Sequence, residues 1–231
     1  MRKILSIVFA TAILCAGCSK EHPVNTVKSN LFKVSIIPSV DAIANSTWQQ
    51  VLGGEALINF TFANTDTLSA LPIKDSLNLK NAVSYNKQVL AGTYDITLKT
   101  ESTAVADTFI RFNAQVSNLL INKDQAINFA ATTNDGVITI SKSMIDTLTV
   151  PTFTPTGTST ALNFGLANGY YFIYVADATA GRITFTESTS GYQYMKDLTV
   201  SALNQYDLSP ILNTTSIAVH LHHFNLKANI Q

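Results

Sequence analysis

Cysteine is almost absent from the sequence, and this scarcity removes two kinds of structure. The 231 residues include two cysteines, Cys15 and Cys18, and none follows Cys18. A disulfide framework and a cysteine-based metal site are therefore excluded from the rest of the chain. Whatever folds there must be held together by its apolar core.

Charge is also scarce, and neither sign predominates. Charged residues make up 13% of the chain, with 15 basic and 15 acidic side chains. Without an excess of Lys and Arg there is no basic field to attract nucleic acid, so no nucleic-acid partner is expected. The uncharged polar residues are mainly Thr, Ser and Asn, which favours strands with hydroxyl-bearing faces over surface helices.

The motifs that carry common enzyme chemistry are missing as well. The sequence has no Gly-x-Ser-x-Gly elbow, no HExxH motif, no phosphate-binding loop and no dinucleotide fingerprint. We therefore expect no enzymatic activity and no cofactor. A glycosidase-like carboxylate pair is the remaining catalytic alternative, and it would have to come from scattered acids: Asp41, Glu55, Asp95, Glu101, Asp107 and Glu187.

The first eighteen residues have the layout of an export signal. A positive start, Met1-Arg2-Lys3, precedes the apolar run Ile4–Leu14, which is shorter than the roughly 20 residues needed to span a bilayer. The run ends in Cys15-Ala16-Gly17-Cys18, which resembles the bacterial lipobox, although Cys15 stands where that pattern usually has Leu. An ordinary secretory signal cleaved near Gly17 is the alternative.

The lipobox resemblance implies a lipid, such as palmitate, on Cys18. It predicts a signal peptide over 1–17 and a lipid-anchored tether over 18–29. Two or more acyl chains make such anchoring stable, since each buried CH2 contributes about 0.8 kcal/mol. No Asp follows Cys18, which in lipoprotein sorting favours the outer membrane. We expect a lipid-anchored outer-membrane protein that faces either the periplasm or the cell surface.

Alternating apolar and polar residues recur through most of the remaining chain, as half-buried strands require. Examples are Tyr94, Ile96 and Leu98, which alternate with polar neighbours, and the run Ile217–Phe224 near the end. The pattern predicts an all-β protein. We interpret it as two tandem antiparallel β-sandwich domains of an Ig-like or transthyretin-like, Greek-key type.

The stretch 151–160 is rich in Pro and Thr and interrupts the alternation, as a linker does. It predicts an N-terminal sandwich over 30–150 and a C-terminal sandwich over 161–231. One continuous sandwich is the alternative. Within the first part, Asn134-Asp135-Gly136 separates two alternating segments and predicts a tight hairpin, because Asp-Gly readily adopts positive φ angles.

Three features together resemble the fimbrillin-like surface lipoproteins of Bacteroidetes. They are the lipobox, the turn Leu90-Ala91-Gly92-Thr93-Tyr94 that leads into a strand, and the closing run Asn204–Leu208 followed by Ile217–Phe224. The resemblance spans the whole chain after the signal and implies two tandem β-sandwiches that serve as pilus subunits or adhesins. It favours a non-catalytic adhesin or pilus-accessory module with a protein or glycan partner at the cell surface.

Assembly by strand addition is a further implication of the resemblance. It predicts that an N-terminal strand over Leu31–Ile37 can be removed or exchanged. No arginine stands near that strand, since Arg111 is the first arginine after Arg2. The absence of a cleavage-site arginine argues against a polymerising stalk subunit and favours an anchor, a tip or a stand-alone adhesin.

Two sets of side chains are candidates for ligand capture, the alternative function. His220 and His222 fall on one face of a strand and could share a metal ion or a haem, unless they are polar rings on a solvent-facing edge. An aromatic set could bind a glycan or a partner if it is exposed, and otherwise packs a core. Its members are Trp48, Tyr170, Tyr174, Tyr192 and Tyr194.

Overall fold

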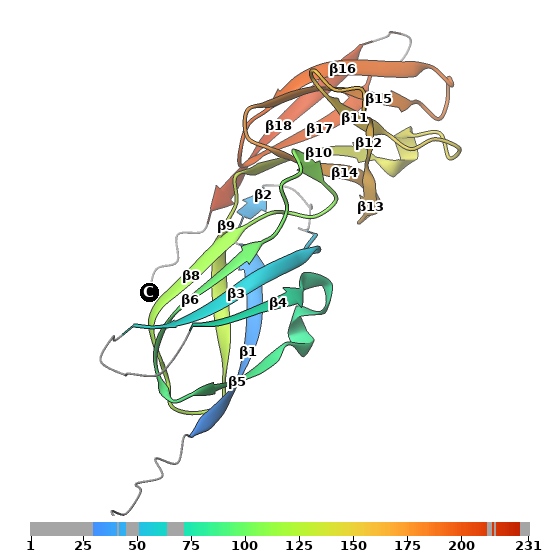
Figure 1. The fold of residues 1–231 in the computed structure, drawn as a ribbon. Coiled ribbons are helices and arrows are strands. Elements are labelled where there is room, and N and C mark those ends of the chain that lie inside the picture. Colours follow the sequence, from blue (N-terminus) through green and yellow to red (C-terminus); the bar gives the residue numbers. More distant parts are fainter. Residues whose placement is uncertain are drawn as a thin grey trace, which may run out of the picture.

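The structure is a computed structural model that describes residues 30–40, 42–44, 51–63, 72–211, 214 and 216–226. Cys18 and Trp48 lie outside these residues, as do the predicted signal peptide 1–17 and tether 18–29. The described elements are strands and two short 3-10 helices, arranged as a lower and an upper half (Figure 1). The predicted all-β sandwich architecture is confirmed.

The lower half is a seven-stranded sheet in the order β4-β3-β6-β8-β9-β1-β5. Strands β8 and β9 pair at one end only, through Asn113 with Thr132 and Ala114 with Ala131. The sheet bends there into two layers, whose inner side chains form the first core. Its elements are β1 (Leu31–Val40), β3 (Glu55–Phe62), β4 (Ile73–Asn78), η1 (Leu79–Ser84), β5 (Asn86–Leu90), β6 (Gly92–Thr100), β8 (Asn113–Ile121) and β9 (Gln125–Thr132).

The upper half consists of two further sheets around a second core. One has the order β13-β14-β10-β17-β18-β2, with β7 added beside β14, and the other has the order β12-β11-β15-β16. The elements of the first are β2 (Ala42–Ala44), β7 (Ala106–Asp107), β10 (Asp135–Ser141), β13 (Gly165–Ala167), β14 (Tyr170–Ala176), β17 (Asn204–Pro210) and β18 (Ile217–Leu226). Those of the second are β11 (Thr152–Pro155), β12 (Leu162–Asn163), β15 (Thr179–Thr186) and β16 (Gln193–Val200), and η2 (Lys142–Met144) follows β10.

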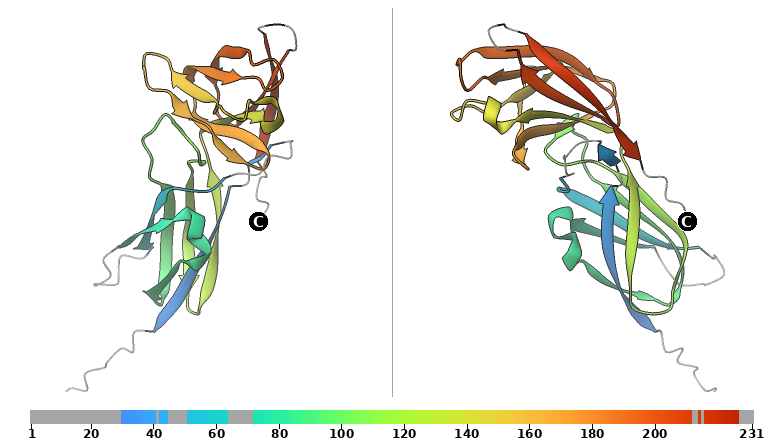
Figure 2. Two further views of the ribbon diagram at one scale, coloured as in Figure 1. Left: turned by 90° about the vertical axis from the view of Figure 1, so that its right-hand side faces the viewer. Right: turned by 180° about the vertical axis from the view of Figure 1, so that it is seen from behind.

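The two halves share buried side chains where they meet. Val137, Phe172 and Tyr174 belong to strands of the upper half but lie in the first core. The chain also crosses the junction, because β7 pairs with β14 and β2 pairs with the end of β18. Figure 2 shows the upper half set against one end of the lower half. The halves therefore form a continuous packed body.

The prediction of a linker at 151–160 is wrong, because its first half is a strand. Phe153 is fully buried in the second core, and β11 pairs with β15 from Thr152 to Pro155. The start of the upper half is also earlier than the predicted boundary at 150, since β10 begins at Asp135. The residues at every second position, Pro151, Phe153 and Pro155, are buried, so the alternation of a strand is present within this Pro- and Thr-rich stretch.

The predicted hairpin at Asn134-Asp135-Gly136 does not form. The preceding strand, β9, pairs with β1 and β8, whereas β10 pairs with β14 and β17. The segment is therefore the crossing from the lower to the upper half. The pairs β1–β9 and β10–β17 are parallel, so the sheets are not purely antiparallel as predicted.

Candidate binding surfaces

Tyr174 lies inside the first core and not on a surface. Its hydroxyl accepts a hydrogen bond from the backbone N–H of Val51 at 3.0 Å. Phe172 meets the ring edge to face, with 5.8 Å between ring centroids. Tyr170, at the start of the same strand, is half-buried against the same core. This part of the predicted aromatic face packs the junction between the two halves.

Tyr194 lies in the second core, on a different sheet. It is almost fully buried and stacks on Phe185, with centroids 5.5 Å apart and ring planes 13° from parallel. Tyr192 is 60% exposed. The four described tyrosines are therefore not brought together, and they form no open row on which a sugar ring could stack. Trp48, the fifth residue of the set, lies outside the described residues.

His220 and His222 share one face of β18, as the alternation of strand side chains requires. The register places His220 opposite Asp207 and His222 opposite Gln205 of β17. The Nε2 atom of His220 lies 3.5 Å from the hydroxyl of Ser209. In the part of the chain that the structure describes, no three His, Cys, Asp or Glu side chains gather as metal ligands would. Among the described residues, the predicted histidine pair therefore has no third ligand of these types.

A row of polar side chains continues from the histidines across the sheet, and sequence analysis missed it. Asp207 accepts a hydrogen bond from the Thr139 hydroxyl, and the Gln205 amide donates to the same hydroxyl oxygen, both at 3.1 Å. Partial burial raises the pKa of Asp207, since the charged form loses hydration, while Thr139 and the two histidines act in the opposite direction. Thr139 is separated from these partners by 68 and 66 residues, so no local sequence pattern could have revealed the row.

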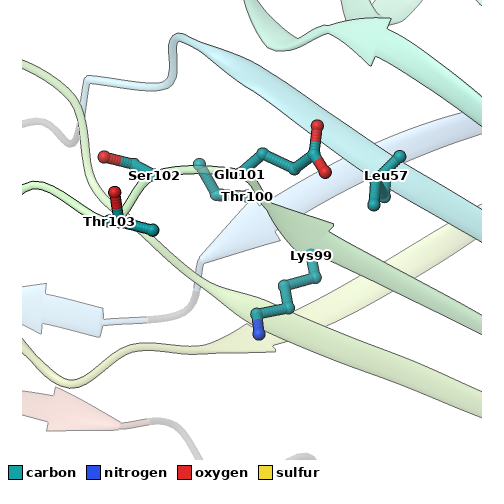
Figure 3. Close-up of a pocket in the computed structure, with 6 residues that line it drawn as sticks. All are labelled: Leu57, Lys99, Thr100, Glu101, Ser102 and Thr103. Atoms are coloured by element: carbon teal, nitrogen blue, oxygen red, sulfur yellow. The ribbon is translucent and has the colours of Figure 1, made fainter.

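Two adjoining hollows near the junction form a surface of mixed polarity that we call the waist hollow. Their volumes are about 460 and 260 Å³, and they share Lys99, Thr100 and Ser102. In the larger one, Glu101 lies beside Leu57 of β3 while Lys99 extends away from it (Figure 3). The other lining residues are Thr103, Arg111, Phe112, Asn113, Thr132, Thr133, Asn134 and Asp135.

An ion pair fixes one wall of the waist hollow. The Arg111 guanidinium donates to both carboxylate oxygens of Asp135, with Nη2 at 2.6 Å from Oδ1 and Nε at 3.0 Å from Oδ2. The Arg111 backbone N–H also donates to Asp135, and the Thr133 hydroxyl donates to the Arg111 carbonyl. The Arg111 and Asp135 side chains are 15% and 5% exposed. This wall is therefore preformed.

The rest of the waist hollow offers free hydrogen-bonding groups. Among the described residues, no hydrogen bond or ion pair engages the side chains of Lys99, Asn113 and Asn134. An ammonium and two amides can donate to hydroxyl or carboxylate oxygens of a polar ligand. These groups lie beside the wall that the Arg111–Asp135 pair fixes.

Strand β1 is inserted between two strands that lie far from it in the sequence. It runs antiparallel to β5 and parallel to β9. Val34 and Ile36 are fully buried, whereas Leu31 and Ile37 are about half exposed. Without β1, the first core would open along a groove bordered by the unpaired backbone edges of β5 and β9. The predicted exchangeable segment thus coincides with a strand that closes the lower half.

No helix long and apolar enough to cross a membrane is present among the described residues.

Comparison with known proteins found similarity among solved structures alone. No family model and no curated protein matches the chain. A putative cell adhesion protein from Bacteroides uniformis has a TM-score of 0.48 and 13% identity, over 85% of this chain and 97% of that one. The tip fimbrial protein Mfa3 from Porphyromonas gingivalis, truncated at its C-terminus, has a TM-score of 0.43 and 6% identity, over 84% and 100%.

A fimbrial assembly protein from Parabacteroides distasonis is also similar, with a TM-score of 0.39 and 8% identity, over 84% of this chain and 96% of that one. All three are described as fimbrial or putative cell adhesion proteins.

Proposed function

We propose that this chain is a non-catalytic, lipid-anchored outer-membrane protein that acts at the cell surface as a fimbrillin-like adhesin or pilus-accessory module. The observation that carries the proposal is the position of β1. An N-terminal strand that closes a sheet between two distant neighbours can be replaced by an equivalent strand of another protein, which is binding by strand addition.

The chemistry of β1 fits this role. Its inward side chains, Val34 and Ile36, are apolar and fully buried. Backbone pairing on both edges supplies affinity, and the pockets for alternate side chains supply specificity. A replacement strand would therefore need the same alternation of apolar residues and a matching register against β9.

The segment around β1 contains no arginine, since Arg111 is the first after Arg2. A trypsin-like maturation cut after arginine would therefore not remove β1, so an incoming strand would have to displace it. The chain would accordingly serve at the end of an assembly, as anchor or tip, or act alone as an adhesin.

A peptide replacement experiment tests the strand-addition function. The chain lacking residues 31–40 is mixed with a labelled peptide of that sequence, and with a control peptide carrying Val34→Asp and Ile36→Asp. The native peptide should form a stable complex, while the control should not, because two carboxylates would enter the apolar core. Equal binding of both peptides would contradict the proposal.

A second measurement uses the complete chain, in case the shortened one does not fold. Amides of β1 should exchange with deuterium through a local opening that leaves the β6–β8 pairing intact. If β1 exchanges only in global unfolding together with β6 and β8, it is not a replaceable strand.

Lipid attachment has its own test. In cells fed a radiolabelled or clickable palmitate, the chain should take up label, and Cys18→Ser should abolish both the label and the membrane fractionation. Cys15→Ser is the matched control and should retain both, because Cys15 precedes the cleavage site. Label that survives in Cys18→Ser would rule out the proposed anchor.

A further inference from the structure

The loop that follows η2 exposes the apolar side chain of Leu148 to solvent. Leu148 is 91% exposed and Val150 is 48% exposed. We call Asp146–Val150 the knob. An isolated exposed leucine on a mobile loop would need no explanation, but this loop is firmly built.

The knob is fixed by hydrogen bonds on both sides of Leu148. The Leu148 N–H donates to Asp146 Oδ1 at 3.0 Å, and the N–H of Thr149 donates to the Asp146 carbonyl at 3.0 Å. The Asp146 N–H in turn donates to the carbonyl of Thr186 at 2.9 Å. Ile145, one residue earlier, is buried in the second core. Leu148 is therefore presented by a preorganised turn, which lowers the entropic cost of binding.

A neighbouring loop, residues 187–190, also holds the base of the knob in place. Ile145 forms a β-bridge with Glu187, and the backbone N–H and side chain of Ser188 donate to the carbonyls of Met144 and Ser143. Glu187 is itself nearly buried and accepts hydrogen bonds from Ser190. Two loops are thus joined into one rigid edge with Leu148 at its outside.

The same chain carries a hollow of mixed polar and apolar lining that none of its described residues fills. It lies where the halves meet, has a volume of about 420 Å³, and we call it the notch. Leu166, on its wall, is 51% exposed to water. The apolar wall is made by Leu52, Gly53, Gly54, Phe109, Leu166 and Phe172, and the polar lining includes Asn78 and Lys80.

We propose that the knob of one copy of this chain binds in the notch of a second copy. The high exposure of Leu148 shows that it does not occupy the notch of its own chain. Charge also matches: Asp146 lies at the base of the knob and Lys80 lines the notch, and neither takes part in an ion pair among the described residues. Apolar burial of Leu148 with an Asp146–Lys80 pair at the rim makes the two surfaces complementary.

The contact is small, so the association is weak in dilute solution. It gains strength where copies are held side by side on a membrane, which raises their effective concentration. Because knob and notch are different surfaces, the contact is heterologous and can extend beyond two copies. The inference deepens the proposed assembly function and depends on it for its biological setting.

Disulfide trapping tests the contact directly, since the chain after Cys18 has no cysteine. Two variants of the chain from Ser19 onward, which retains every described residue, carry Leu148→Cys and Leu166→Cys respectively. Mixed together, they should form a linked dimer about tenfold or more faster than Leu148→Cys mixed with Leu120→Cys, because docking brings only the first two thiols together. Leu120 is 55% exposed and belongs to neither surface.

Sedimentation velocity supplies the second readout. The average mass of the unmodified chain should rise with concentration, and Leu148→Ser should abolish that rise while Leu120→Ser should not. Equal trapping rates for the two mixtures, or an unmodified chain that remains monomeric throughout, would overturn the inference. The peptide replacement test of β1 is independent of Leu148, so either idea can fail without the other.

Discussion

At the scale of single residues, Glu187 shows how a buried carboxylate organises a loop. It accepts hydrogen bonds from the Ser190 hydroxyl at 2.7 Å, the Ser190 N–H at 2.6 Å and the Thr189 N–H at 2.8 Å. These bonds, led by that of the Ser190 hydroxyl, outweigh desolvation and lower the pKa of Glu187 from 4.5 to about 2. The charged form is therefore the one that the fold requires.

Replacing Glu187 by Gln should lower the melting temperature at pH 7, because the amide presents one acceptor oxygen where the carboxylate has two. Because the pKa of Glu187 is lower in the folded state than in the unfolded state, its ionised carboxylate stabilises the fold at pH values above the unfolded pKa. This contribution is lost as the pH falls through the folded pKa. The difference between the native chain and Glu187→Gln should accordingly shrink between about pH 4.5 and pH 2. Circular dichroism melts across this range would measure it.

Glu101→Gln is the matched control for that series, since Glu101 is exposed and its carboxylate takes part in no hydrogen bond among the described residues. It should leave the melting temperature unchanged at every pH. A pH-independent loss in Glu187→Gln would show that packing, not charge, is responsible.

At the scale of elements, the crossing from β9 to β10 depends on a glycine for space. Gly136 has no positive φ, but a Cβ there would lie 2.6 Å from the carbonyl oxygen of Ser201 and 3.1 Å from that of Asn204. These are backbone atoms, which cannot move aside as a flexible side chain can. The glycine allows β10 to enter the upper sheet close to the turn before β17.

Gly136→Ala should therefore destabilise the protein more than Gly157→Ala does. Gly157 has a φ of 82°, and a Cβ added there would meet no described atom within 4 Å, so its replacement costs about 1 kcal/mol of backbone strain. The free energies of unfolding from urea titrations would give the comparison. An equal loss in both variants would mean that the Gly136 backbone relaxes freely.

Sequence patterns predicted elements well and their pairing poorly. Alternation in Tyr94, Ile96 and Leu98 correctly indicated a strand with one buried face. The turn residues at 134–136 were misread because local turn chemistry does not specify which strands pair across the fold. The Pro- and Thr-rich stretch at 151–160 was misread because composition outweighed the buried Phe153.

The candidate surfaces divide in the same way. That His220 and His222 share a face follows from strand geometry alone, and was predictable. Burial of Tyr174 depends on which face of β14 meets a second layer, which the sequence does not reveal because both faces of this strand are apolar. The polar row around Asp207 is formed by segments that long-range strand pairing brings together. The same is true of the waist hollow.

At the scale of the whole molecule, contacts at the junction couple the two halves, so we expect them to unfold together. Tyr174 links β14 to Val51, β7 adds to the upper sheet, and Arg111 pairs with Asp135 at the crossing. Shared burial and a buried ion pair favour cooperative unfolding over independent melting of two domains.

Arg111→Met should test this coupling, because it leaves the Asp135 carboxylate buried without its partner. The expected loss is about 3–5 kcal/mol, typical of a broken buried pair. Arg182→Met is the control: Arg182 and Asp197 also form a two-point contact, but their side chains are 55% and 70% exposed, so little or no change is expected.

Calorimetry should show one transition in the native chain, and two resolved transitions would contradict the coupling.

The position of β1 between β5 and β9 also determines the order in which the lower half can fold. Lys33 contacts Asp124 across 91 residues of sequence, and β1 is synthesised first of all the strands. During synthesis, the backbone of β1 therefore stays unpaired and its apolar side chains stay uncovered until β5 and then β9 have been made. Since such distant pairing is slow, the last closure of the lower half is the step most open to competition from a strand of another molecule.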